Sequence, residues 1–197
     1  MKPTLKKVKK QTKNKFANMY EFVYDYKGKE FSYNVGSRRD IDEKTANKHK
    51  LDAVVILPYV IEGGDIHVVF TKEFRYAIND YVYDVPAGCV DPGENGDEAA
   101  IREIKEEIGA EVLLLERCTD LSFTSPGFTN ETSQTYFALV NLNGKQHLES
   151  TEIITKKLVP LEEVLDFVGS HQMAMQGRLL AKIFYYKAMF EQLKKKK

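Results

Sequence analysis

Alternating apolar and polar residues dominate the first half of the chain and predict β-strands. Residues 20–26 and 29–35 read YEFVYDY and KEFSYNV on either side of Lys27-Gly28, a pattern typical of a β-hairpin. The apolar run AVVILPYV and the alternating DIHVVFTKEF predict two more strands, joined by a turn at Gly63-Gly64. A short apolar stretch over 81–85 predicts another strand.

The period changes after residue 96 and predicts a helix that ends before Gly109. Asp97 and Glu98 place negative charge at the positive end of the helix dipole, and glycine at 109 is a natural stop. Three isoleucines recur at spacings of three and four, so one apolar stripe is expected. These residues are Ile101, Ile104 and Ile108.

The second half continues with strands and closes with helices. Strands are predicted over 111–116, 135–140 and 152–159, with Asn143-Gly144 as a hairpin turn between the last two. A loop with Ser125-Pro126-Gly127 spans 121–130. A short helix is predicted over 161–168 and an amphipathic helix over 178–193, so the fold class is α+β. The amphipathic stripe consists of Leu179, Ile183, Phe184, Met189 and Phe190.

Three regions are predicted along the chain. Residues 1–15 are basic and nearly devoid of large apolar side chains, which predicts a flexible arm. Residues 16–50 form a small N-terminal β extension, too short to bury a core alone. Residues 51–197 form the main domain.

Composition narrows the classes of function. The net charge is zero, so no general nucleic-acid or membrane-surface partner is expected. Cys89 and Cys118 have no metal-type spacing and are expected to be free thiols, with one disulfide between them as the alternative. No apolar run is long enough to span a bilayer and no signal peptide is present, so a cytoplasmic location is expected.

The predicted helix over 97–108 concentrates acidic residues on one face. Glu103 and Glu107 lie one turn apart with Glu106 beside them, and Arg102 is placed to pair with Glu106. A like-charge pair at about 4 Å costs roughly 4 kcal/mol at an effective dielectric constant near 20. One arginine does not neutralise three carboxylates, whereas a hard divalent cation such as Mg²⁺ would. The alternative is a solvated acidic face, which is common on helices.

The loop before this helix favours the metal interpretation. Gly, five residues, Glu, seven residues and then Arg-Glu-apolar-x-Glu-Glu-x-Gly-apolar are present without a missing position. The residues are Gly88, Glu94, Arg102, Glu103, Ile104, Glu106, Glu107, Gly109 and Ala110. This pattern resembles the signature of the Nudix hydrolases, and the resemblance covers roughly residues 35–170. It implies an α/β/α sandwich around a mixed β-sheet and hydrolysis of a nucleoside diphosphate derivative at its pyrophosphate.

Features outside the signature resemble the ADP-ribose pyrophosphatase branch. Pro126 lies sixteen residues after Ala110 in a loop followed by Glu131. In that branch the segment that precedes the signature usually contains Gln-Tyr-Arg, followed by a Glu just before Leu-Pro-Ala-Gly. Here Glu73 and Phe74 precede Arg75, and Asp84 replaces the later Glu.

The resemblance implies roles for individual residues. The metal ligands it implies are Glu103, Glu106 and Glu107, the carbonyl of Ala87, and Glu94 through water. The catalytic residues are Glu131, as general base or additional ligand, with Glu106 and Arg102. The substrate-binding residues are Arg39, Arg75, Gly88, Pro126 and Gly127. Purely structural roles remain the alternative for Glu131 and Arg75, and for Arg39 a structural role is favoured.

We therefore expect Mg²⁺-dependent hydrolysis of ADP-ribose to AMP and ribose 5-phosphate, with Mn²⁺ as the alternative metal. Two alternatives stay open: another nucleoside diphosphate sugar or a dinucleotide as substrate, and a nucleotide-binding regulator without turnover. The resemblance also implies a homodimer in which the β extension contacts the partner. The candidate rings for base stacking are Phe31, Tyr33 and Phe128, each of which also suits a core or dimer contact.

Overall fold

The computed structural model describes residues 2–195. The chain forms two compact units, each built from two segments. The first comprises Met1–Asp52 and Leu121–Ser133, and the second comprises Ala53–Asp120 and Gln134–Lys197. The segment 121–133, which carries the predicted residues Pro126, Gly127 and Glu131, therefore belongs with the N-terminal strands, an assignment that the sequence did not predict.

The first unit is organised around an antiparallel sheet in the order β1-β2-β3. The strands are β1 (Thr4–Lys10), β2 (Asn18–Tyr26) and β3 (Lys29–Ser37). The predicted hairpin is confirmed, with positive φ at Lys27 (55°) and Gly28 (75°), as a two-residue turn requires. Segment 121–133 joins this sheet, because the Gly36 N–H donates to the Phe128 carbonyl at 2.9 Å. Strand β9 (Ser122–Phe123) pairs with Thr132 and Ser133.

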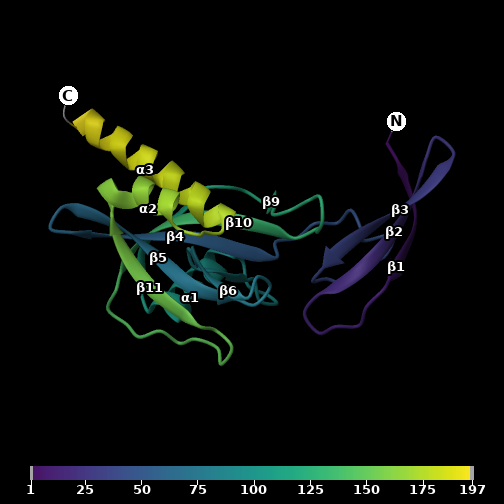
Figure 1. The fold of residues 1–197 in the computed structure, drawn as a ribbon, viewed down its shortest axis with the longest axis horizontal. Coiled ribbons are helices and arrows are strands. Elements are labelled where there is room, and N and C mark those ends of the chain that lie inside the picture. The colour runs from purple at the N-terminus through teal and green to yellow at the C-terminus, as the bar shows by residue number, and fades with distance from the viewer. Residues whose placement is uncertain (1, 196–197) are drawn as a thin grey trace. The chain divides into compact units, whose positions relative to one another are not determined.

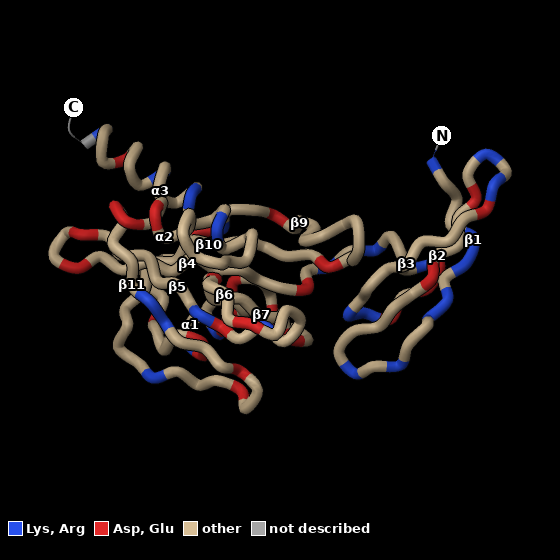
Figure 2. The backbone as a smooth tube through the Cα atoms, viewed as in Figure 1, with Lys and Arg blue, Asp and Glu red and all other residues tan. Residues whose placement is uncertain are grey.

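The prediction of a flexible arm over 1–15 is wrong for residues 4–10, which form β1 and pair with β2. Leu5 and Val8 are the half-buried side chains of this strand, while its lysines are exposed. Figure 2 colours these basic positions of β1 blue. Lysines suit an edge strand because they discourage pairing with another sheet, so a basic composition does not exclude a strand here. Met1, also in the predicted arm, lies outside the described residues.

The second unit is a sheet with helices on both faces (Figure 1). Its strands run in the order β11-β5-β4-β10-β8, with β6 beside β5 and β7 beside β4. The strands are β4 (Ala53–Glu62), β5 (Asp65–Arg75), β6 (Asp80–Asp84), β7 (Ala87–Cys89), β8 (Glu111–Arg117), β10 (Thr132–Asn141) and β11 (Ile154–Pro160). The helices are α1 (Gly96–Ile108), the short η1 (Leu161–Glu163), α2 (Val164–Ser170) and α3 (Met175–Lys195).

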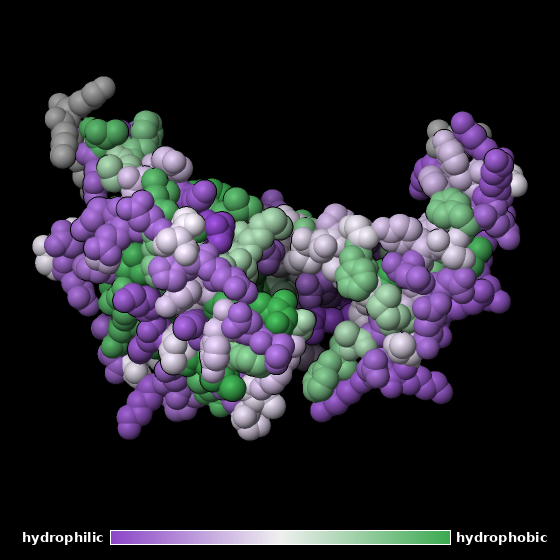
Figure 3. All heavy atoms as spheres, in the orientation of Figure 1, coloured by the Kyte–Doolittle hydropathy of each residue, from purple (hydrophilic) through white to green (hydrophobic). Residues whose placement is uncertain are grey.

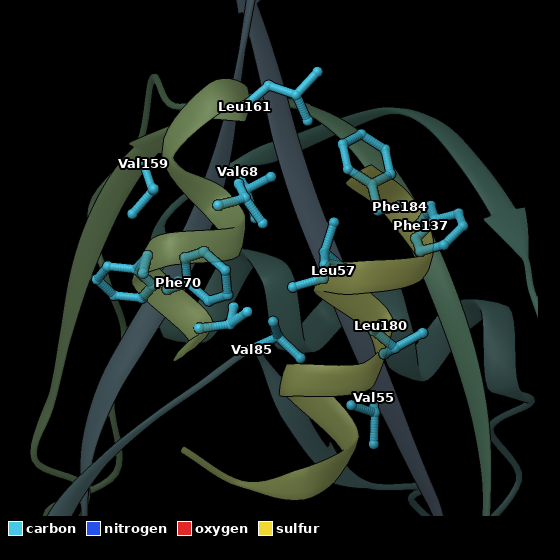
Figure 4. Packing of buried hydrophobic residues seen from close by; sticks show 14 residues of the cluster. Val55, Leu57, Val68, Phe70, Val85, Phe137, Val159, Leu161, Leu180 and Phe184 are labelled. Atoms are coloured by element: carbon cyan, nitrogen blue, oxygen red, sulfur yellow. The ribbon is translucent and has the colours of Figure 1, made fainter. Parts of the chain in front are cut away.

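The central strand β4 shows why the unit is layered. Val55 and Leu57 join the buried cluster that includes residues of α2 and α3 (Figure 4), whereas Val54 and Ile56 point to the other face, where α1 packs. A strand that is covered on both faces consists of a nearly continuous run of apolar residues, which explains the sequence AVVILPYV of β4. The predicted α/β/α sandwich is confirmed.

The segment around Asn143 corrects one predicted hairpin. Strand β11 pairs with β5 and not with β10, so Asn143-Gly144 is no hairpin turn. Instead, residues 144–147 cover the last carbonyls of α1. The Gly144 and His147 N–H groups donate to the Gly109 and Glu106 carbonyls at 2.9 and 2.8 Å. The Gln146 amide and the Lys156 ammonium donate to the Glu107 and Ile108 carbonyls at 2.5 and 2.9 Å. Helix ends need such partners, and this end is satisfied by tertiary contacts.

Two helical stripes also differ from expectation. In α1, Ile104 and Ile108 are fully buried, but Ile101 is 47% exposed and borders an open cavity. In α3, Phe184 is buried with Leu180 and Ala181, whereas Leu179, Ile183 and Phe190 are exposed. Apolar side chains gather at the C-terminal end of α3 (Figure 3). Helix α3 has apolar residues on two of its sides. The periodicity of the sequence therefore did not identify which side packs against the sheet. Within residues 2–195, no helix is both long and apolar enough to cross a bilayer.

Two features favour glycine at position 109, directly after α1: a positive φ and the lack of space for a Cβ. Together they yield a prediction about stability. The φ of Gly109 is 62°, and a Cβ there would lie 2.6 Å from the carbonyl carbon of Lys145. We expect Gly109→Ala to destabilise the protein by more than about 2 kcal/mol. Gly63 has the same φ of 62° with open space around it, so Gly63→Ala should cost only about 1 kcal/mol. Urea unfolding measures both, and equal losses would contradict the proposed crowding at Gly109.

Candidate active site

The candidate site is built where β7 leads into α1. Strand β7 lies antiparallel to β4, with Val55 opposite Ala87 and Val54 opposite Gly88. The chain then turns through Gly93, whose φ is 91°. The helix begins with a capping box, in which the Asn95 side chain accepts from helix N–H groups and the Glu98 side chain accepts from the Asn95 N–H. The sequence analysis identified the acidic first turn but not the Asn95 cap.

Arg102 joins the loop to the helix. Its Nε and Nη2 donate to the two carboxylate oxygens of Glu94, each at 3.0 Å, and Nη2 also donates to the Cys89 carbonyl at 2.8 Å. Its Nη1 donates to Glu103 at 2.6 Å and to Glu106 at 3.1 Å. The predicted pair with Glu106 is thus present, and Arg102 lowers the pKa of the Glu94 carboxyl below its usual range. The same contacts raise the pKa of Arg102, which stays charged.

Glu103 and Glu107 are carboxylates withdrawn from water, with exposed fractions of 7% and 4%. Burial raises the pKa of Glu103, although Arg102 opposes the shift. Burial also raises the pKa of Glu107 well above its usual range, and the charges of Glu103 and Glu73 raise it further, against a hydrogen bond from the Ala87 N–H. Among the described residues, no lysine or arginine forms an ion pair with Glu107.

Gly88 makes room for this pair. A Cβ at position 88 would overlap the carboxylate of Glu103, so the helix and β7 approach as closely as they do only because residue 88 is glycine. Gly88 was predicted as a substrate-binding residue, and its observed contact is with Glu103. The Ala87 N–H binds the Glu107 carboxylate, while ligation by the Ala87 carbonyl stays a prediction.

The donor set fits a hard divalent cation. Buried carboxylate oxygens without a neutralising partner are costly, and Mg²⁺ binds through one or two carboxylates while keeping several waters. Glu107 has no ionic partner among the described residues, and Glu103 has only Arg102, which it shares with Glu94 and Glu106. Glu106 is different, because its side chain is 42% exposed to solvent. Within residues 2–195, no group of three or more acidic, His or Cys side chains is already arranged to enclose a metal ion. The buried pair is the part of the predicted trio that is withdrawn from water, and ligation by all three glutamates stays a prediction.

Two further carboxylates act on this pair. Glu73 raises the pKa of Glu107, and Glu152 raises the pKa of both Glu103 and Glu107. Burial raises the pKa of Glu73 itself, and Arg75 opposes that shift. The sequence marked Glu73 as a replacement for glutamine. It gave no signal for Glu152, which precedes β11 and acts on the pair through its charge.

Arg75 lies between two carboxylates, and one of them, Glu73, raises the pKa of Glu107 in the buried pair. Its Nη1 is 3.0 Å from Glu73 Oε1 and its Nη2 is 3.3 Å from Asp84 Oδ2. Glu73 and Arg75 share one face of β5 by strand alternation, and Asp84 comes from the neighbouring strand β6. Glu73, Arg75 and Asp84, which precede the signature in the sequence, thus form one connected group of charges.

The remaining predicted residues lie in the first unit. Glu131 accepts hydrogen bonds from Arg38 Nε at 2.7 Å and from the Thr124 hydroxyl at 3.0 Å. Arg39 lies 3.3 Å from Asp52 and donates to the Asn130 carbonyl at 2.9 Å. The Gly127 carbonyl accepts from the Tyr33 hydroxyl at 2.5 Å.

Pro126 borders an aromatic cavity of about 200 Å³ in the same unit. Of the three candidate stacking rings, Tyr33 and Phe128 line this cavity. All three rings are about half exposed: Phe31, Tyr33 and Phe128. These contacts do not test the substrate-binding roles predicted for Arg39, Pro126 and Gly127 or the catalytic role predicted for Glu131. Those roles stay predictions.

Comparison with known proteins agrees with the geometry. A family model described as the NUDIX domain matches residues 49–177. An uncharacterized Nudix hydrolase of Schizosaccharomyces pombe is 33% identical over 147 residues, which cover 70% of this chain and 71% of that protein. An ADP-ribose pyrophosphatase of Bacillus subtilis is 32% identical over 122 residues. The match covers 61% of this chain and 64% of that protein, so the chain spans less than two thirds of its length. The crystal structure of an ADP compounds hydrolase superposes with a TM-score of 0.74 at 17% identity, covering 98% of this chain and 96% of that one. That likeness shows the fold.

The burial of Glu107 predicts a pH-dependent stability effect. Its pKa in the folded protein lies above the unfolded value, so the metal-free protein should lose stability as pH rises through the folded pKa. We expect Glu107→Gln, measured in EDTA near pH 8, to be more stable than the parent by about 1 kcal/mol. The difference should shrink as the pH falls through the raised folded-state pKa of Glu107, because the parent carboxyl then becomes protonated.

Glu62→Gln is the matched control, because Glu62 is exposed at the end of β4. It should unfold like the parent near pH 8 and at lower pH. Thermal unfolding in EDTA measures all three proteins. A Glu107→Gln protein that is less stable than the parent near pH 8 would show that the buried charge is compensated within the protein.

Proposed function

This chain belongs to the Nudix hydrolase family, and from that membership we propose that it hydrolyses the pyrophosphate bond of ADP-ribose or a related nucleoside diphosphate sugar. The products would be AMP and a sugar phosphate. The similarity to ADP-ribose pyrophosphatases of Bacillus subtilis and Saccharomyces cerevisiae, at 32% and 30% identity, supports this substrate class.

The observation that carries the proposal is the buried pair of Glu103 and Glu107 behind Gly88. In our proposal these two carboxylates hold the divalent cation, Mg²⁺ with Mn²⁺ as the alternative. Glu106, Glu94 and the Ala87 carbonyl assist them. When bound, such a cation neutralises phosphate charge and lowers the pKa of a coordinated water.

The other residues have separate tasks in this proposal. Arg102 keeps the loop and the helix in register through its contacts with Glu94, Glu103 and the Cys89 carbonyl. Arg75 binds phosphate oxygens, because a guanidinium presents paired N–H donors in one plane. Glu131 is our candidate for the general base, which takes the proton from the attacking water. Arg39, Pro126 and Gly127 are proposed substrate contacts.

We also propose a homodimer in which the N-terminal strands contact the partner. Exposed rings on β3 support this assignment, since Phe31 and Tyr33 are 45% and 44% exposed on a short sheet. A cytoplasmic location stays a prediction from the sequence.

A panel of substrates tests the function. The purified protein with Mg²⁺ is offered ADP-ribose, other nucleoside diphosphate sugars and dinucleotides, and the products are identified by mass. We expect the highest kcat/KM for ADP-ribose. A higher kcat/KM for another compound would move the assignment to the alternative substrate class. Tight binding of ADP-ribose without product after hours would favour a regulator that lacks turnover.

The buried pair gives the sharpest activity prediction. Glu107→Gln should lower kcat for ADP-ribose by more than about 100-fold, because a neutral amide is a poor ligand for a hard cation. Glu62→Gln should keep the parent activity, since Glu62 is exposed and distant in the sequence from the signature. Steady-state kinetics at saturating Mg²⁺ measures both variants, and undiminished turnover by Glu107→Gln would contradict the metal role.

A further inference from the structure

Arg75 is held so that part of its guanidinium stays available. Two of its nitrogens face Glu73 and Asp84 at 3.0 and 3.3 Å, while its side chain is 40% exposed. A guanidinium has five N–H donors in a rigid plane, and only some of them are used by these carboxylates. The two acids therefore fix the orientation of the plane and leave donors for another anion.

Asp84 is the more rigid of the two partners. It is 6% exposed, and its Oδ1 accepts the Val85 N–H at 2.9 Å while its Oδ2 faces Arg75. A Cβ on Gly177 would overlap Asp84 Oδ1, so the backbone of α3 closes directly over the carboxylate. Glu73, in contrast, lies on the same strand as Arg75 and is electrostatically coupled to Glu107.

The segment before α3 is itself attached to β6. The Tyr83 N–H donates to the Gln172 carbonyl at 2.9 Å, and the Ala174 N–H donates to the Tyr83 carbonyl at 3.0 Å. The first turn of α3 and the strand that carries Asp84 are thus hydrogen-bonded neighbours. This arrangement keeps Gly177 over the carboxylate.

We propose that Asp84, seated by the backbone of Gly177, is a positioning residue that orients Arg75 toward the diphosphate of the substrate. The proposal rests on the proposed function and adds two residues to it. A long arginine side chain loses considerable rotamer entropy when it binds an anion. A fixed carboxylate behind it removes that loss before the substrate arrives, which is the advantage of preorganisation.

A double-mutant cycle tests the proposal. Asp84→Asn keeps the shape and the contact with the Val85 N–H but removes the charge that faces Arg75. We expect KM for ADP-ribose to rise about tenfold with little change in kcat, since Arg75 contacts the diphosphate before and during reaction. In an Arg75→Ala background, Asp84→Asn should change KM less than about twofold, because its target is gone.

Gly177→Ala provides a second variant that leaves every charge in place. Its methyl group would displace the Asp84 carboxylate, so KM should rise as it does for Asp84→Asn, and the rise should vanish in the Arg75→Ala background. Gly169→Ala in α2 is the matched control, because a Cβ there meets open space. It should retain the parent KM.

Equal effects of Asp84→Asn with and without Arg75 would overturn the proposal and assign Asp84 to the fold alone. An unchanged KM in both Asp84→Asn and Gly177→Ala would overturn it too. Failure of the proposed function is a separate result, seen as no turnover by the parent with any compound of the panel. The same cycle is then measured as binding of ADP-ribose by calorimetry, and additive losses or no binding there would also overturn the proposal.

Discussion

The electrostatic repulsion between Glu103 and Glu107 is the constraint on which the second unit depends. The two carboxylates lie one helical turn apart, both are largely removed from water, and Glu73 and Glu152 add to the same negative field. Such a group is unfavourable unless a cation or a proton neutralises it. Many surrounding features are best understood as the support that keeps α1 in place despite this cost.

That support acts at both ends of α1. At the start, the Asn95–Glu98 capping box and the bidentate contact of Arg102 with Glu94 tie the helix to the loop after β7. At the end, residues 144–147 and Lys156 satisfy the final carbonyls. The helix cannot shift away from β7 and return the two carboxylates to water without breaking these hydrogen bonds. Stability is thus spent to keep a site ready for a ligand, as is common at functional sites.

The sequence predicted the features that depend on local pattern. The strands other than β1, β7 and β9, the β2–β3 hairpin, the limits of α1 and the Arg102–Glu106 pair follow from periodicity, turn residues and fixed spacing. It failed where a distant segment decides the outcome. Asn143-Gly144 has the composition of a hairpin turn, yet its neighbours bind the end of α1. Ile101 continues an apolar stripe, yet it is 47% exposed, whereas Ile108 is fully buried. Glu152 could not be foreseen, because no spacing rule connects it to the signature.

The first unit is built from two segments that lie far apart in the sequence, and this affects how the chain folds during synthesis. Its two segments meet only when Gly36 contacts Phe128 and Thr129, which are about ninety positions further along. Long-range pairings of this kind form late, since a large loop must close first. Although domains usually fold in the order in which they leave the ribosome, this unit is complete only after residues 121–133, and with them about half of the other unit, have been translated. Its three N-terminal strands pair locally, whereas the contact with segment 121–133 has to wait for that later part of the chain.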